Sequence, residues 1–176
     1  MKVQENAILL SKINDPNCSS EELETLVGKD KEIDRIIASH VNAGAETLKK
    51  LARSNDTQTK EYVTGNPNTP RALLLNVLAE DFPKAMLLNP AFDLMVLENP
   101  DFLVDIYSST LAAILRQAEC PASIVEWAFT RFSQQDDFSP EILNAIAQNP
   151  SVKVSMIEEI IVMDTPMEMT TAEGPL

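Results

Sequence analysis

The sequence predicts an all-α protein that is assembled from short helices. Signals that start and stop helices recur along the whole chain, whereas the alternating apolar and polar residues of strands and the Asn-Gly or Asp-Gly turns of β-hairpins do not. A three-residue apolar pattern also recurs, at intervals that average about 24 residues. A spacing of that size is typical of proteins built from stacked structural repeats.

The helix stops are mostly Asn-Pro pairs. A residue that precedes proline is pushed out of the helical conformation, so each pair is expected to end a helix. The four pairs are Asn66-Pro67, Asn89-Pro90, Asn99-Pro100 and Asn149-Pro150.

The helix starts are hydroxyl and proline signals. Ser19 followed by Glu22 reads as a capping box, in which each residue bonds the other's backbone N–H. Thr69-Pro70 and Ser139-Pro140 each place a hydroxyl at the expected N-cap and a proline at the first helical position.

The apolar pattern reads L-x-x-L-A with substitutions, which puts all three apolar residues on one face of a helix. The copies are Leu23, Leu26, Val27; Leu48, Leu51, Ala52; Leu75, Leu78, Ala79; Leu94, Leu97; Ile124, Trp127, Ala128; and Leu143, Ile146, Ala147. One short helix cannot bury such a face alone but stacked copies can, which predicts an α-solenoid. An irregular helical bundle remains the alternative. We expect Leu23, Leu48, Leu78 and Leu143 to lie in one continuous core.

Two segments resemble the unit of the variant leucine-rich repeat family. One is Asn66-Pro67-Asn68-Thr69-Pro70 followed by Leu74, Val77 and Leu78, and the other runs from Leu143 through Ile146-Ala147-Gln148-Asn149-Pro150. The resemblance covers residues 14 to 161 and implies a right-handed α-solenoid of helix pairs, in which an α-helix alternates with a second, often 3-10, helix. One type in this family holds an iron–sulfur cluster on amino-terminal cysteines. Only Cys18 lies in that region here, so no cofactor is expected.

We expect a single repeat domain over residues 1–162. Residues 1–13 would form an amino-terminal capping helix, and residues 14–162 about six repeat units. Residues 163–176 contain two prolines and a glycine without apolar periodicity, so they are expected to be a flexible tail.

The chain carries a formal net charge of −13, and the excess lies in one part of it. Residues 61–176 contain 17 acids and 5 bases, whereas residues 1–60 are nearly balanced. Nucleic acids and anionic membranes attract clustered cations, so both are disfavoured as partners.

No constellation of residues for catalysis or metal binding is evident. His40 is the only histidine, and it stands where asparagine ends other helices, so a capping or surface role is expected. Cys18 and Cys120 form no CxxC pair and are read as small residues at helix starts. Trp127 is expected to pack in the core. We therefore expect no enzymatic activity.

One stretch of the chain is a candidate binding site. No Lys or Arg occurs between Lys84 and Arg116, and the gap contains Asp93, Glu98, Asp101 and Asp105. These acids predict that a protein or peptide partner is basic. The expected function is a non-enzymatic scaffold that binds proteins or peptides. The alternative is an acidic inhibitor or immunity-type protein that masks a basic enzyme, and a weaker one is a helical-repeat enzyme or nucleic-acid reader.

The two unpaired cysteines, together with the lack of a signal peptide or a long apolar span, predict a cytoplasmic protein.

Overall fold

In the computed structural model, which describes residues 9–134 and 137–164, every regular element is a helix, so the all-α prediction is confirmed for this part of the chain. Residues 9–13 are helical. They are followed by α2 (Ser20–Glu24), α3 (Lys31–Ser39), α4 (Ala45–Leu51), α5 (Thr57–Gly65), α6 (Arg71–Leu73), the π-helix η1 (Leu74–Leu78), α7 (Pro83–Leu87), α8 (Pro90–Glu98), the 3-10 helix η2 (Pro100–Asp105), α9 (Ser108–Leu115), α10 (Ala122–Phe132), α11 (Pro140–Ala147) and α12 (Val154–Asp164).

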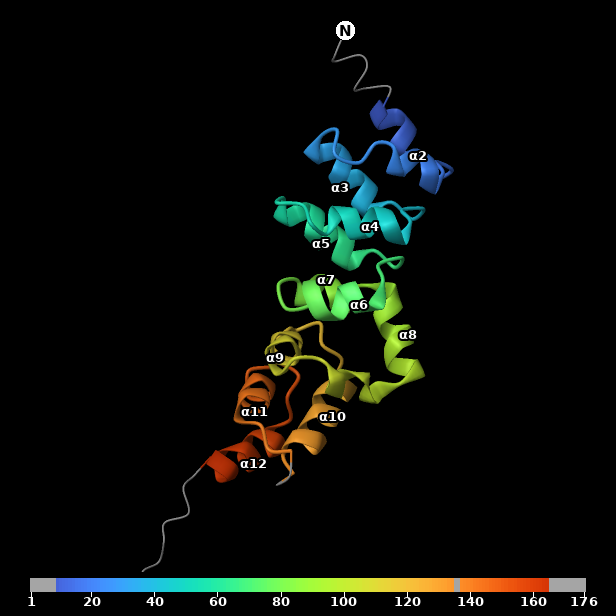
Figure 1. Cartoon of the computed structure of the whole chain (residues 1–176). Coiled ribbons are helices and arrows are strands. Elements are labelled where there is room, and N and C mark those ends of the chain that lie inside the picture. The colour runs from blue at the N-terminus through green and yellow to red at the C-terminus, as the bar shows by residue number, and fades with distance from the viewer. Residues whose placement is uncertain (1–8, 135–136, 165–176) are drawn as a thin grey trace, which may run out of the picture.

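The helices are stacked along one long axis, from α2 at one end to α12 at the other (Figure 1). Alternate helices form a continuous row, because α3, α5, α7, α9 and α11 each pack against the next. Among the described elements only η2 is a 3-10 helix, so the expected alternation of α and 3-10 helices is not seen there. The expected capping helix lies partly, and the tail almost wholly, in residues 1–8 and 165–176, outside the described residues.

Most of the predicted helix starts and stops are confirmed. Each Asn-Pro pair follows the end of a helix, and the capping box at Ser19 is complete: its hydroxyl accepts a hydrogen bond from the Glu22 N–H at 3.3 Å, and its own N–H donates to the Glu22 carboxylate at 3.2 Å. The start at Thr69 is wrong by one residue. Pro70 is the N-cap of α6, and the Thr69 hydroxyl instead donates to the buried carbonyl of Val63.

Six turns in the described residues share one hydrogen-bond pattern. In each, one residue donates its backbone N–H to the carbonyl three positions earlier, at 3.0–3.2 Å, and its own carbonyl accepts from the N–H three positions later, at 2.8–3.1 Å. We call these the turn residues. They are Asp15, His40, Asn66, Asn89, Gln117 and Asn149.

Asparagine side chains connect successive turns. The Asn66 amide donates to the carbonyls of Ala38 and His40 at 2.8 and 2.9 Å, and the Asn89 amide repeats this one turn later, on the carbonyls of Thr64 and Asn66. Asn149 bonds two carbonyls of the preceding turn in the same way. All three asparagines are buried, and we call these bonds the asparagine ladder.

His40 takes the place of asparagine in this ladder. Its Nδ1 accepts from the Asn42 N–H at 3.0 Å, and its Nε2 lies 3.1 Å from the carbonyl of Asp15, the preceding turn residue. Because His40 is also the C-cap of α3, its expected capping role is confirmed. The ladder lacks one rung, since the Gln117 amide donates to Ala113 in its own helix rather than to the Asn89 turn.

The hydrophobic core falls into two clusters rather than the single one expected. Leu23, Leu48 and Leu78 are buried in the first cluster, whereas Leu143 is buried in the second. The clusters divide at η1, because Leu78 belongs to the first cluster and Leu74 and Leu75 belong to the second. Helix α5, which packs against η1, buries Thr59 and Thr64. Their hydroxyls are bonded to Asp56 and to the Lys60 carbonyl, so this layer is polar and fully satisfied.

The π-helix η1 marks one extra residue. Leu48 and Leu51 in α4 and its C-cap residue Ala52 are all buried. Their counterparts after the next turn are Leu74, Leu78 and Ala79, in which the first two residues are four positions apart instead of three. The wider π turn, closed by the Ala79 N–H on the Leu74 carbonyl at 2.9 Å, keeps all three buried.

Deleting Asn76 should therefore be tolerated. The side chain is exposed, and its removal restores the spacing of α4, so we expect the free energy of unfolding to change by less than about 1 kcal/mol. Deleting Lys49 from the regular helix α4 is the control, because it rotates Leu51 and Ala52 off the buried face by about 100°. Thermal unfolding followed by circular dichroism compares the two. Equal losses of stability would show that η1 is not a one-residue insertion.

Candidate binding surface

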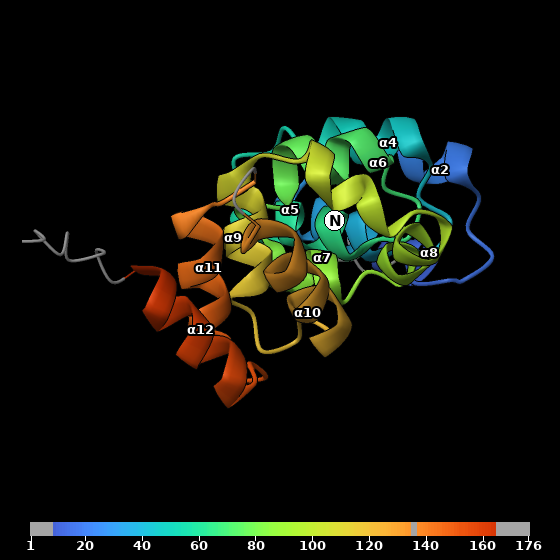
Figure 2. The same ribbon diagram turned by 90° about the horizontal axis from the view of Figure 1, so that it is seen from below.

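Helix α8 breaks a spacing that the other turns keep. After five of the six turns, a helix begins five residues beyond the turn residue; α4, for example, begins at Ala45 after His40. After Asn89, α8 begins at once, at Pro90. Figure 1 shows α8 running along the side of the stack rather than across it. Viewed along the stack, α2, α4 and α6 lie together on one side, whereas α10 and α12 lie on another (Figure 2).

The early start of α8 exposes leucines that the sequence pattern predicted to be buried. Leu97 lies eight residues after its turn residue, the spacing at which Leu23 and Leu48 are buried, yet it is 80% exposed. Leu94 is 61% exposed. The opposite face, with Phe92 and Met95, enters the core instead. The prediction that Leu94 and Leu97 form a core motif is therefore wrong.

The four predicted site acids lie on α8 and η2, and all are exposed. Asp93 and Glu98 flank the two leucines on the outer face of α8. A helix turns about 100° per residue, so the order around its axis is Asp93, Leu97, Leu94 and Glu98. Asp101 and Asp105 follow on η2, with the exposed Val104 between them. We call these seven residues the α8–η2 surface: Asp93, Leu94, Leu97, Glu98, Asp101, Val104 and Asp105.

Basic residues that are distant in the sequence lie near these carboxylates in the structure. Arg71 from α6 stacks over the Phe102 ring at 4.8 Å, and Arg131 from α10 lines a hollow of about 410 Å³ together with Asp101 and Asp105. Arg131 is itself paired with Asp137 at 2.9 Å. Within the described residues, none of the four predicted site acids forms an ion pair. The surface therefore keeps its negative charge.

Trp127 connects this surface to the core. It packs partly buried against the second cluster, edge-on to Phe132 with ring centres 6.2 Å apart. Its indole Nε1 donates to the Asp101 carboxylate at 3.4 Å. The predicted core position is thus confirmed in part, and the polar edge of the ring holds one of the site acids.

Both cysteines are buried, and neither thiol is activated. Cys18 and Cys120 each lie three residues after a turn residue and directly before the N-cap of a helix. They therefore stand beside helix starts, as expected, but do not occupy the N-cap in place of serine. Burial raises the pKa of the Cys120 thiol to about 12. The pKa of Cys18 is also raised, mainly by burial and then by the negative charge of Glu22. The raised pKa values favour the protonated form of both thiols at neutral pH.

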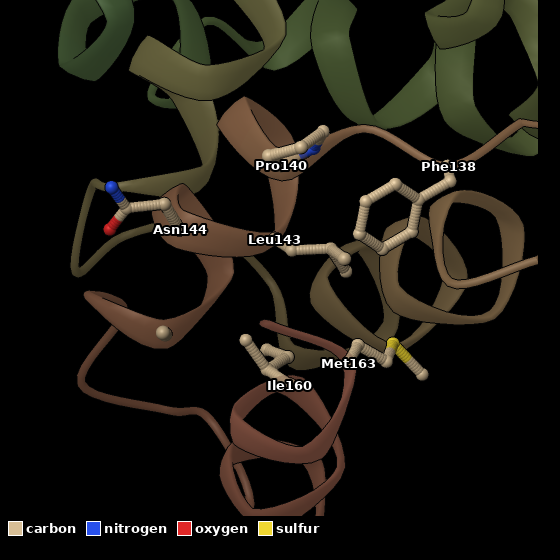
Figure 3. Close-up of a pocket in the computed structure, with 7 residues that line it drawn as sticks. Phe138, Pro140, Leu143, Asn144, Ile160 and Met163 are labelled. Carbon is tan, nitrogen blue, oxygen red and sulfur yellow. The ribbon is translucent and has the colours of Figure 1, made fainter. Parts of the chain in front are cut away.

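A second hollow, which the sequence did not suggest, lies between α11 and α12 (Figure 3). Its volume is about 300 Å³, and its wall is mostly apolar. Figure 3 shows Phe138, Leu143, Ile160 and Met163 around it. No spacing rule connects Phe138, in the loop before α11, with the far end of α12, which is why local patterns gave no signal for it.

Across residues 9–134 and 137–164, no three side chains of His, Cys, Asp or Glu are grouped so that they could hold a metal ion. In the same ranges, none of the helices combines the length and apolar composition needed to cross a bilayer. No protein-family model, curated protein or solved structure matches the chain.

Proposed function

We propose that this chain is a right-handed α-solenoid of the variant leucine-rich repeat type, and that it binds a protein or peptide without catalysing a reaction. Six turns with the same hydrogen bonds and a continuous row of packed helices support the solenoid. In such folds each unit contacts mainly its neighbours, which leaves long surfaces open to a partner.

The observation that carries the binding function is the exposure of Leu94 and Leu97. Burying a leucine is worth about 1.5–3 kcal/mol. The position of Leu97 holds a buried leucine after three other turns, at Leu23, Leu48 and Leu74. A helix that instead turns two leucines to solvent, at the point where the regular spacing breaks, has the character of an interaction surface.

Affinity purification from extracts of the source organism tests this function. The tagged chain should retain a set of proteins that the double variant Leu94→Ser/Leu97→Ser loses. The matched control is Val41→Ser/Val77→Ser, which removes two exposed aliphatic side chains elsewhere on the molecule and should retain that set. Quantitative mass spectrometry compares the three samples. If no protein separates the leucine variant from the control, the α8–η2 surface is not where the chain binds.

A further inference from the structure

We propose that the partner presents a basic amphipathic helix to the α8–η2 surface. The partner's apolar face would cover Leu94 and Leu97, and its Lys or Arg side chains would meet the flanking carboxylates. This inference rests on the proposed function and specifies the chemistry of the partner. Three features of the surface support this partner: the apolar stripe of Leu94 and Leu97, the position of Glu98, and the hollow beside η2.

The apolar stripe has the dimensions of one helical turn. Leu94 and Leu97 are three residues apart, so they stand about 4.5 Å apart along the axis of α8 and on the same side of it. An amphipathic helix repeats its apolar residues at three- and four-residue intervals, so two of its side chains can pack against this pair. Asp93 and Glu98 border the stripe, where such a helix carries its polar residues.

Glu98 is in an unfavourable position until a cation approaches. It is the last residue of α8, where the unpaired carbonyls make the helix end negative, and no basic residue lies in that last turn. A Lys or Arg of the partner would place a positive charge beside both the Glu98 carboxylate and the negative end of the helix, which lowers the electrostatic energy of both. Charge complementarity is therefore strongest at this end of the stripe.

The hollow beside η2 extends the same pattern. It begins at Asn99 just beyond Glu98, has a volume of about 410 Å³, and has two carboxylates in its wall. The one cation in its wall, Arg131, is paired with Asp137. One long basic side chain fits such a space, since its aliphatic stem can lie on Val104 and its charge can reach Asp101 and Asp105.

The surface disfavours the other occupants. A second copy of the chain would bring its own four carboxylates against these four, and the repulsion between like charges would weaken binding. Nucleic acid is repelled for the same reason. An extended peptide that adds to a sheet has no strand edge to join in the described residues. The backbone groups of a helical peptide are already paired with one another, so such a peptide binds through its side chains. The α8–η2 surface likewise offers side chains for binding.

A direct test uses three fluorescent peptides of 16 residues and the full chain. The first is an idealised helix of leucine and lysine, the second has the same composition in an order without an apolar face, and the third has glutamate in place of lysine. Fluorescence anisotropy gives the dissociation constant of each. We expect the first to bind at least about tenfold more tightly than the other two, with an affinity that falls as salt rises from about 0.1 M to 1 M.

Two variants assign the binding to the α8–η2 surface. Leu94→Ser/Leu97→Ser should weaken the first peptide at least about tenfold. The fourfold variant Asp93→Asn/Glu98→Gln/Asp101→Asn/Asp105→Asn should weaken it and flatten the salt dependence. The control removes four exposed carboxylates elsewhere, with Glu21→Gln/Glu80→Gln/Glu141→Gln/Glu158→Gln, and has the same net charge.

Equal binding of the first two peptides, or equal loss with the control variant, would overturn the inference, because either result indicates attraction by net charge alone. Failure of all three peptides would overturn it as well. The proposed function would still stand in that case if the purified protein set continued to depend on Leu94 and Leu97, since the partner would then have a different chemistry.

Discussion

Replacing Asn66 with aspartate should lower the free energy of unfolding by about 4 kcal/mol at neutral pH. The Asn66 side chain is 2% exposed, and its amide donates to two buried carbonyls. A carboxylate has the same shape but cannot donate to either. The change therefore removes both side-chain hydrogen bonds and places a negative charge against the two carbonyls. The His40 carbonyl keeps its bond from the Ala43 N–H at 3.0 Å, whereas the carbonyl of Ala38 loses its side-chain donor.

The size of the loss should depend on pH. Burial beside two carbonyls raises the pKa of the introduced carboxyl above the ordinary value of about 3.9, because the charged form is disfavoured. The neutral form can donate one of the two lost bonds. Since the folded-state pKa is raised, stability is best kept below the unfolded value and is lost as pH rises through the folded one. The deficit should thus be smaller near pH 4 than at pH 7.

Urea unfolding of three proteins measures this effect: the wild type, Asn66→Asp and the control Asn144→Asp. Asn144 is exposed and bonds only the Gln148 side chain, so its variant should lie within about 0.5 kcal/mol of the wild type. If both variants unfold at the wild-type midpoint, the asparagine ladder does not contribute to stability.

Truncating Leu48 to alanine should cost about 2–5 kcal/mol, through lost burial and the cavity that remains. Its matched control is Leu97→Ala, which removes the same atoms at the same spacing after a turn. Leu48 is fully buried and Leu97 is 80% exposed, so the control should change stability by less than about 0.5 kcal/mol. Urea midpoints followed by circular dichroism compare the pair. A loss in Leu97→Ala as large as in Leu48→Ala would contradict the outward orientation of α8.

The helical class could be predicted because its signals are local. Proline after asparagine restricts the backbone wherever it occurs, and the Ser19 capping box needs only four residues. The function of the asparagine side chains could not be predicted in this way. The sequence predicts helix stops at these asparagines, whereas each amide of the asparagine ladder also bonds carbonyls between 23 and 34 residues earlier. No window of neighbouring residues contains that information.

The sequence predicted the four acidic residues of the candidate site but not its exposed leucines, Leu94 and Leu97. The pattern that correctly buries Leu23, Leu48 and Leu78 also covers Leu94 and Leu97, because spacing within a helix says nothing about where the helix begins relative to the preceding turn. The copy at Leu143 shows the same limit. It aligns with the copy at Leu23 without gaps, yet α11 precedes a turn, whereas α2 follows one.

The direction of the asparagine ladder has a consequence for synthesis. Asn66 donates backward to residues 38 and 40, Asn89 backward to 64 and 66, and Asn149 backward to 115 and 117. When each of these asparagines leaves the ribosome, the carbonyls it needs have already emerged. Every donor can therefore be satisfied at once, while only the acceptors of the newest turn wait for the chain that follows. The amino-terminal part of a chain emerges first during translation, so the direction of the ladder allows the hydrogen bonds between turns to form in the order in which the residues are made.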